Sequence, residues 1–111
     1  LKYIRKTFLD IFKEYNIITA GIRVTEHNAQ NIDLFRIMIE AIIQELIASS
    51  NANYYFTGVI SSICSKLEIP NDGQIKSIID GTNSFLEINN WNTFSKEHRE
   101  CILVGYASNN R

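Results

Sequence analysis

Residues 92–101, NTFSKEHREC, gather a histidine, an arginine, a cysteine and two glutamates within a few positions. His98 and Cys101 are three residues apart, so on a helix they share a face. With His27 and Cys64 they are all the histidines and cysteines of the chain, and a tetrahedral zinc site would need all four. Structural zinc sites bring their ligands in close pairs, whereas this sequence offers one weak pair and two isolated residues. We therefore predict no metal and no cofactor.

The same segment has the composition of a helix start. Asn92 and Ser95 are both favourable N-cap residues, and Glu97 falls in the first turn, where the helix dipole favours negative charge. The face shared by the histidine and the cysteine also carries Phe94 and Ile102. A face of this composition is more typical of a protein core than of a cleft. The segment is therefore expected to be structural.

Recognisable catalytic motifs are missing from the sequence. A nucleophilic cysteine would need a neighbouring base and a third group that orients the base, but Cys64 lies on an apolar helix face. The five glycines are scattered, and no glycine-rich phosphate loop, zinc-protease helix or nucleophile elbow occurs. We predict no catalytic residues and no enzyme.

The composition is that of an ordinary globular chain. It has 111 residues, 45% of them apolar and 21% charged, with a net charge of −1, which excludes wholesale disorder and lacks the basic excess of a dedicated nucleic-acid binder. Two cysteines do not make a disulfide framework, so free thiols in a cytoplasmic setting are expected. No apolar run is long enough to insert into a membrane. The chain begins at Leu1, which is compatible with a fragment of a longer protein.

Periodicity predicts the elements of secondary structure. Apolar residues at helical spacing predict helices over 1–15, 28–48, 54–68, from Asn71 or Asp72 onward with a break at Gly81, and from about 92 to 107. Residues 17–25 alternate instead, which predicts a short strand at 18–24. The segment with the most similar pattern is 101–107, which could pair with this strand. The pattern there is compatible with either a strand or a helix.

The segment 28–48 has an apolar arc wider than one core contact requires. Its polar residues form a single stripe, Asp33, Arg36, Glu40 and Gln44. Such a helix lies in the middle of a domain or also faces a partner. We therefore predict a mainly α fold, one domain over 1–111, built as a bundle of four to five helices around this central helix.

Three function classes follow. The favoured one is a small regulatory module that binds another protein or itself through Ile39, Ile43, Leu46 and Trp91. A nucleic-acid-binding domain would use the basic face of the first helix, Lys2, Arg5, Lys6 and Lys13. A small-ligand sensor would use His98 and Cys101.

A short sequence resemblance adds a more distant alternative. Residues 89–94, NNWNTF, place Trp91, Asn92, Thr93 and Phe94 together. This string resembles the tryptophan-containing motif near the C-terminal end of Bcl-2-type proteins, and it covers about six residues. The resemblance implies a regulator of cell death that acts through protein contacts. The sequence departs from that family at 53–56, where NYYF stands in place of an Asn-Trp-Gly-Arg motif.

Overall fold

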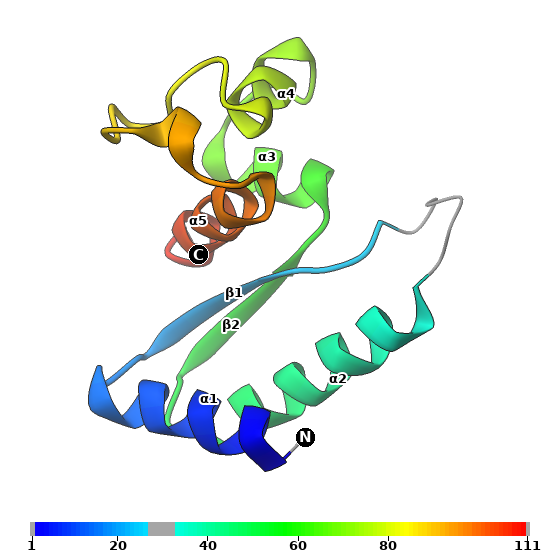
Figure 1. The fold of residues 1–111 in the computed structure, drawn as a ribbon, viewed down its shortest axis with the longest axis vertical. Helices are drawn as coiled ribbons and strands as arrows, with labels where there is room; N and C mark the ends of the chain where they lie inside the picture. The colour runs from blue at the N-terminus through cyan, green and yellow to red at the C-terminus, as the bar shows by residue number, and fades with distance from the viewer. Residues whose placement is uncertain (1, 27–32, 111) are drawn as a thin grey trace.

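The alternating segment near the N-terminus forms one of two parallel strands. The computed structural model describes residues 2–26 and 33–110. In chain order its elements are α1 (Lys2–Glu14), β1 (Thr19–Arg23), α2 (Leu34–Ala48), β2 (Tyr54–Gly58), α3 (Ile60–Leu67), α4 (Gly73–Asp80), the 3-10 turn η1 (Trp91–Thr93) and α5 (Lys96–Ser108) (Figure 1). β1 pairs with β2 from Thr19 opposite Tyr54 to Arg23 opposite Gly58. Parallel strands need a long crossover, and α2 lies within it.

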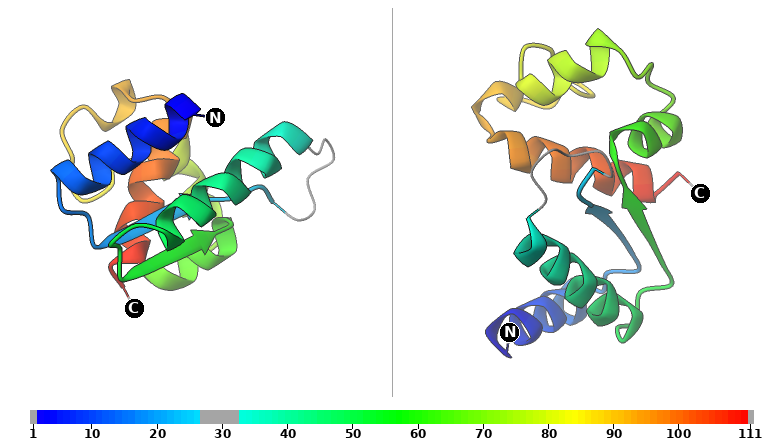
Figure 2. Two further views of the ribbon diagram at one scale, coloured as in Figure 1. Left: turned by 90° about the horizontal axis from the view of Figure 1, so that it is seen from below. Right: turned by 90° about the vertical axis from the view of Figure 1, so that its right-hand side faces the viewer.

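The helices lie on both sides of this strand pair. Helices α1 and α2 lie on one side, and α3, α4 and α5 lie on the other (Figures 1 and 2). Burial of both faces is what parallel sheets require. None of the described helices is both long and apolar enough to cross a membrane.

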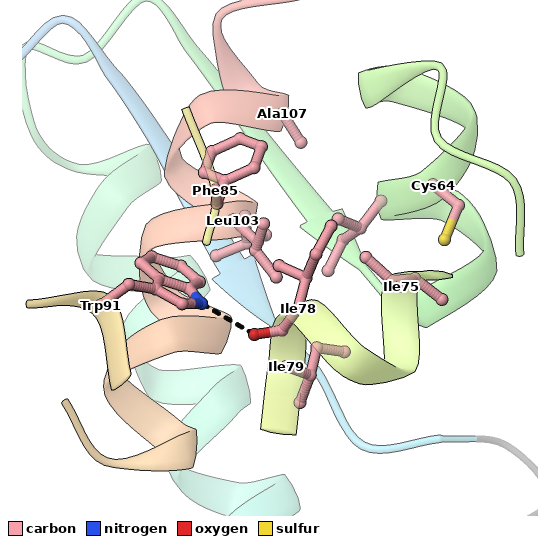
Figure 3. Packing of buried hydrophobic residues seen from close by; sticks show 10 residues of the cluster. Cys64, Ile75, Ile78, Ile79, Phe85, Trp91, Leu103 and Ala107 are labelled. Carbon is pink, nitrogen blue, oxygen red and sulfur yellow. Dashed lines mark hydrogen bonds between the residues drawn. The ribbon is translucent and has the colours of Figure 1, made fainter. Parts of the chain in front are cut away.

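The main hydrophobic cluster lies entirely in the second half of the chain. Its buried members are Ile63, Cys64, Ile75, Ile78, Ile79, Phe85, Trp91, Leu103, Val104 and Ala107 (Figure 3). These residues come from α3, α4, η1, α5 and the connection that follows α4. The cluster therefore lies on the α5 side of the strands, and no residue of α2 belongs to it.

Three helices begin at the side-chain caps that their sequences favour. Asp33 accepts from the backbone N–H of Arg36 at 3.1 Å at the start of α2. Asp72 accepts from Gln74 at 2.8 Å at the start of α4, and Ser95 accepts from His98 at 3.1 Å at the start of α5. Helix α4 ends at Gly81, whose φ of 87° suits glycine. The predicted start of α4 at Asp72, the N-cap expected at Ser95 and the break at Gly81 are confirmed, whereas the predicted start of the helix over 28–48 falls outside the described residues.

Two predicted elements have a different structure. The helix predicted over 54–68 is wrong in its first part: residues Tyr54–Gly58 form β2, and the helix covers only Ile60–Leu67. Aromatic and β-branched side chains in 54–57 fit a pleated, half-buried surface better than a short helix. The strand at 18–24 is confirmed as β1. Its expected partner at 101–107 is wrong, because that segment lies inside α5.

The mainly helical composition is confirmed in outline, but a bundle around the segment 28–48 is not. The described residues place a strand pair between α2 and α5, and the buried cluster forms on the α5 side. Residues 28–32 of the predicted helix lie outside the described part of the chain. Helix α2 buries only Leu46 and Ile47. The wide apolar arc of this helix is therefore left partly exposed.

Candidate functional site

The outer face of α5 carries His98 and Cys101, and both side chains are exposed. The expectation that this face belongs to the core is wrong for these two residues, because α5 buries mainly the opposite face through Leu103, Val104 and Ala107. Phe94 and Ile102 are partly buried and do pack against the core. The His98 ring is tilted by 34° against the ring of Phe94, with 4.6 Å between ring centroids. Among the described residues no group of three or more His, Cys, Asp or Glu could hold a metal ion. His27 lies outside the described residues.

Between these two residues lies Arg99, which is only 7% exposed. Its Nε donates to the carbonyl oxygen of Ile79 at 2.6 Å, and its Nη1 donates to the carbonyl oxygen of Phe94. The indole Nε1 of Trp91 donates to the carbonyl oxygen of Ile78 at 2.8 Å (Figure 3). The C-terminal carbonyls of α4 are thus satisfied by two side chains, one of them charged, as the helix dipole favours.

Arg99 was missed because the sequence reasoning grouped residues 97–101 as a charge cluster. A signal for it exists: Arg99 lies four residues before Leu103 and eight before Ala107, so the three share one helix face. That face is the buried one. The segment 92–101 is therefore a helix start with a buried structural arginine, and its histidine and cysteine point away from the core.

The two thiols are poor nucleophiles near neutral pH. Burial raises the pKa of Cys64. Partial burial, and then the carboxylates of Glu100 and Glu97, raise the pKa of Cys101. Nucleophilic reactivity resides in the thiolate. Cys101 therefore lacks the electropositive surroundings of a catalytic cysteine.

We expect iodoacetamide to alkylate Cys101 more slowly at pH 7 than it alkylates a free cysteine peptide. A raised pKa lowers the thiolate fraction at neutral pH, so the rate should still be rising at a pH where the peptide has levelled off. Cys64 should react only after denaturation, because it is buried. Mass spectrometry of the native and the denatured protein measures both rates. A Cys101 that reacts faster than the peptide at pH 7 would contradict this expectation.

The basic residues of α1 are exposed but partly neutralised. Lys6 Nζ lies 2.8 Å from Asp10 Oδ2, and this hydrogen bond raises the pKa of Lys6. Arg5 Nη1 lies 3.7 Å from Glu45 Oε2 of α2. Within the described chain, Lys2 and Lys13 remain without an ion-pair partner. Of the residues described on this face, only these two lysines therefore offer an unpaired positive charge for binding phosphate.

The residues assigned to partner binding lie mostly inside. Leu46 and Trp91 are each 1% exposed, and Ile39 and Ile43 are half-buried. A side chain as buried as Trp91 offers no surface in this conformation, so we assign it to the core, where its ring lies 5.8 Å from Phe85 between centroids. In the motif that resembles Bcl-2-type proteins, Trp91 is therefore buried in the core, while Asn92 and Thr93 are exposed.

The accessible apolar surface of α2 lies on a different face of the helix from Ile39, Ile43 and Leu46. Leu34 and Phe35 are each 71% exposed and Met38 is 60% exposed. Leu34, Met38 and Ala41 are spaced by four and then three residues and so share a face. We call Leu34, Phe35, Met38 and Ala41 the outer face of α2. It continues into an apolar pocket of about 540 Å³ between α1 and α2, lined by Lys2, Arg5, Ala41, Ile42, Glu45 and Leu46.

A second feature is a charged network just after the carboxyl end of β1. Arg23 Nη2 lies 3.1 Å from Glu26 Oε1, and Arg23 Nε lies 3.7 Å from Glu100 Oε1 of α5. Glu26 Oε1 also accepts from the backbone N–H of Ile60 at 2.9 Å, at the start of α3. The side chain of Arg23 is 12% exposed. This network therefore joins β1 to α3 and α5 in a partly buried setting.

A neighbouring set of contacts joins β1 to α2. Glu40 Oε1 accepts from the backbone N–H of Thr25 at 2.8 Å and from its hydroxyl at 2.9 Å. Arg36 Nε lies 3.2 Å from the same oxygen. Two pockets open beside these networks, one of about 370 Å³ that includes Thr25 and Glu40, and one of about 340 Å³ that includes Arg23 and Glu100.

Sequence reasoning did not single out Arg23, Glu26 or Glu100. A signal for the first two exists, because ligand sites of parallel sheets lie outside the carboxyl ends of the strands. Polar residues at and just after a predicted strand are therefore candidates. Glu100 offers no comparable signal, since only the packing of α5 on β1 brings it to Arg23.

Comparison with known proteins gives no relative. No protein-family model matches the chain, and neither the curated proteins nor the solved structures yield a significant match. The functional argument therefore rests on the chain's own residues.

Proposed function

We propose that this chain is a small non-enzymatic interaction module, and that it binds a second copy of itself through the outer face of α2 and the adjoining face of α1. The observation that carries the proposal is the incomplete burial of these two helices. Helix α1 has no buried residue, and the first turns of α2 leave Leu34, Phe35 and Met38 exposed by 60–71%. Monomeric proteins rarely expose a contiguous apolar patch of this kind.

Charge supports a second copy as the occupant. Between Leu34 and Ala41 the outer face carries no charged side chain, because Arg36 lies on another side of the helix and pairs with Glu40 at 3.2 Å. Further along the same face Glu45 pairs with Arg5. A two-fold contact brings identical surfaces together. Between Leu34 and Ala41, two such α2 faces can meet without burying an unpaired charge, which would be strongly unfavourable.

Spacing supports the same occupant. Leu34, Met38, Ala41, Glu45 and Ala48 follow one another at intervals of four and three residues, the spacing that pairs of packed helices use. All five residues are exposed. We also propose that the protein works in the cytoplasm, because its two cysteines are free and thiols stay reduced in that compartment.

Leu34→Glu and Met38→Glu should each weaken self-association. Burying an uncompensated carboxylate at the centre of the contact is expected to raise the dimer Kd by roughly thirtyfold, equivalent to about 2 kcal/mol. Sedimentation equilibrium over a concentration series measures the Kd of each variant. Circular dichroism shows whether each variant stays folded, as expected for exposed positions.

Leu86→Glu is the matched control. Leu86 is 63% exposed and lies in the connection between α4 and η1, on the opposite side of the strands from α2 (Figure 1). The same substitution there should leave the Kd unchanged. A wild-type protein that is monomeric throughout the concentration series would overturn the proposed self-association, as would equal effects of Leu34→Glu and Leu86→Glu.

A further inference from the structure

The pocket of about 340 Å³ beside the end of β1 has an unusual distribution of charge. Its volume falls in the lower part of the range for small-molecule sites, about 300–1,000 Å³. Three parts of the chain each contribute charges of both signs to its lining, three cations and four carboxylates in all: Arg23 and Glu26, then Asp72, Lys76 and Asp80 of α4 and its N-cap, and Lys96 and Glu100 of α5. Both signs of charge are therefore available from separate walls.

Three of these charged groups have no partner among the residues that the structure describes. Arg23 is engaged with Glu26 and Glu100. Within the described ranges the side chains of Lys76, Asp80 and Lys96 take part in no ion pair and no hydrogen bond, although all three line the same pocket. Lys76 and Asp80 have the i, i+4 spacing that allows an ion pair on a helix, yet their charged groups are not within contact distance. Both remain free to meet a ligand.

Arg23 adds a donor that needs an acceptor. Its Nε is buried and has no hydrogen-bond partner. The carboxylate oxygen of Glu100 is 3.7 Å away, beyond hydrogen-bond distance. Buried polar groups in proteins are almost always satisfied by protein, water or ligand. The Nε atom itself is enclosed by the protein, but the Arg23 side chain, 12% exposed, contributes positive charge to the lining of the pocket.

The pocket also has an apolar part. Ile75 is 3% exposed and Ile79 is 7% exposed, and both contribute to the lining together with the half-buried Ile60. In Figure 3 the side chains of Ile75 and Ile79 extend from α4 as members of the core cluster. This side of the pocket suits an aliphatic group.

We propose that this pocket binds an L-α-amino acid with an apolar side chain, its carboxylate toward Arg23 and Lys96, its ammonium group toward Asp80, and its side chain against Ile75 and Ile79. A zwitterion satisfies free groups of both signs at once. The site does not depend on self-association, since α1 and the outer face of α2 do not contribute to it.

Other small ligands fit this lining less well. A phosphate or a dicarboxylate would face four carboxylates, those of Glu26, Asp72, Asp80 and Glu100. A divalent cation would need a cluster of oxygen, nitrogen or sulfur ligands, and no such group exists among the described residues. A fully apolar molecule would bury the unpaired charges of Lys96 and Asp80, which is unfavourable.

The test is a titration of the ¹⁵N-labelled 111-residue chain with each proteinogenic L-amino acid up to about 10 mM, a range that captures millimolar affinities. Saturable changes in amide chemical shift are expected at residues 76–80 and 96–100. These changes should be largest with leucine, isoleucine, valine or methionine. Two probes each lack one charge: isoamylamine, the decarboxylated form of leucine, and N-acetyl-leucine. Both should bind about tenfold more weakly or worse, since each loses a charge-assisted contact.

Variants of the two free groups complete the test. Lys96→Met and Asp80→Asn remove one charge each with little change in shape, and each should weaken amino-acid binding by about tenfold or more. Lys13→Met and Glu87→Gln make equivalent changes outside the pocket and should leave binding unchanged. The proposal is overturned if no amino acid gives a saturable shift at this pocket, if isoamylamine or N-acetyl-leucine binds as tightly as leucine, or if both pocket variants bind like wild type.

Discussion

Gly21→Ala is expected to lower the free energy of unfolding by about 3 kcal/mol or more, at the upper end of the range for overpacked positions. A Cβ at Gly21 would lie 2.2 Å from the carbonyl oxygen of Val104 and 2.7 Å from its carbonyl carbon. Both are backbone atoms of α5, so no side chain can turn away to relieve the contact. The strand or the helix must move, and α5 carries Leu103, Val104 and Ala107 of the core. Urea unfolding followed by the fluorescence of the single tryptophan, Trp91, measures the loss.

Gly105→Ala supplies a control at the next residue of the same helix. A Cβ there meets nothing within 4 Å, and alanine is a better helix former than glycine. This variant should raise the free energy of unfolding by about 0.5–1 kcal/mol. If Gly21→Ala unfolds at the same urea concentration as wild type, then α5 does not approach β1 as closely as described here.

Arg99→Met is expected to cost about 3 kcal/mol of stability, because it leaves one buried and one partly buried carbonyl group without their charged donor. Those acceptors are the carbonyl oxygens of Ile79, at 2.6 Å, and of Phe94. The methionine side chain is close in length to the arginine stem, so the loss reflects hydrogen bonding more than volume. Chemical unfolding followed by circular dichroism measures the change.

Arg5→Met is the matched control for this substitution. Arg5 is 55% exposed and its Nη1 lies 3.7 Å from Glu45, so its removal should change stability by less than about 1 kcal/mol. Arg99→Lys should recover only part of the loss, since a single ammonium group does not reproduce the planar fork of a guanidinium. Equal stability of the Arg99→Met and Arg5→Met variants would show that the guanidinium of Arg99 does not hold α4.

The packing tested by these variants also bears on the proposed ligand pocket. Gly21 and Arg23 lie on the same strand, and Arg99 is adjacent to Glu100 in α5. The close approach at Gly21 lets β1 and α5 bring Arg23 and Glu100 to 3.7 Å. A bound amino acid that contacts both β1 and α5 would stabilise the folded state. Unfolding of the Gly21 and Arg99 variants can therefore be measured with and without the amino acid.

The sequence by itself determined the features that depend on near neighbours. Asp33, Asp72 and Ser95 cap their helices through hydrogen bonds that span two or three residues, and Gly81 ends α4 because glycine readily adopts its positive φ. The strand β1 follows from alternation within five residues. Such signals are local, so they could be predicted before any tertiary contact was known.

Only the tertiary structure decided which strand pairs with β1 and which residues gather at its end. Segment 54–58 has no spacing that distinguishes it from a helix, and it becomes a strand because it pairs in parallel with β1 across the α2 crossover. His98 and Cys101 have suggestive types but lie on an exposed face, whereas Arg99 binds a carbonyl twenty residues earlier. Arg23 meets Glu100 across a separation that no periodicity encodes. The physical reason is that long-range pairing depends on the burial of complementary surfaces brought together by the whole chain, not on the propensities of neighbouring residues.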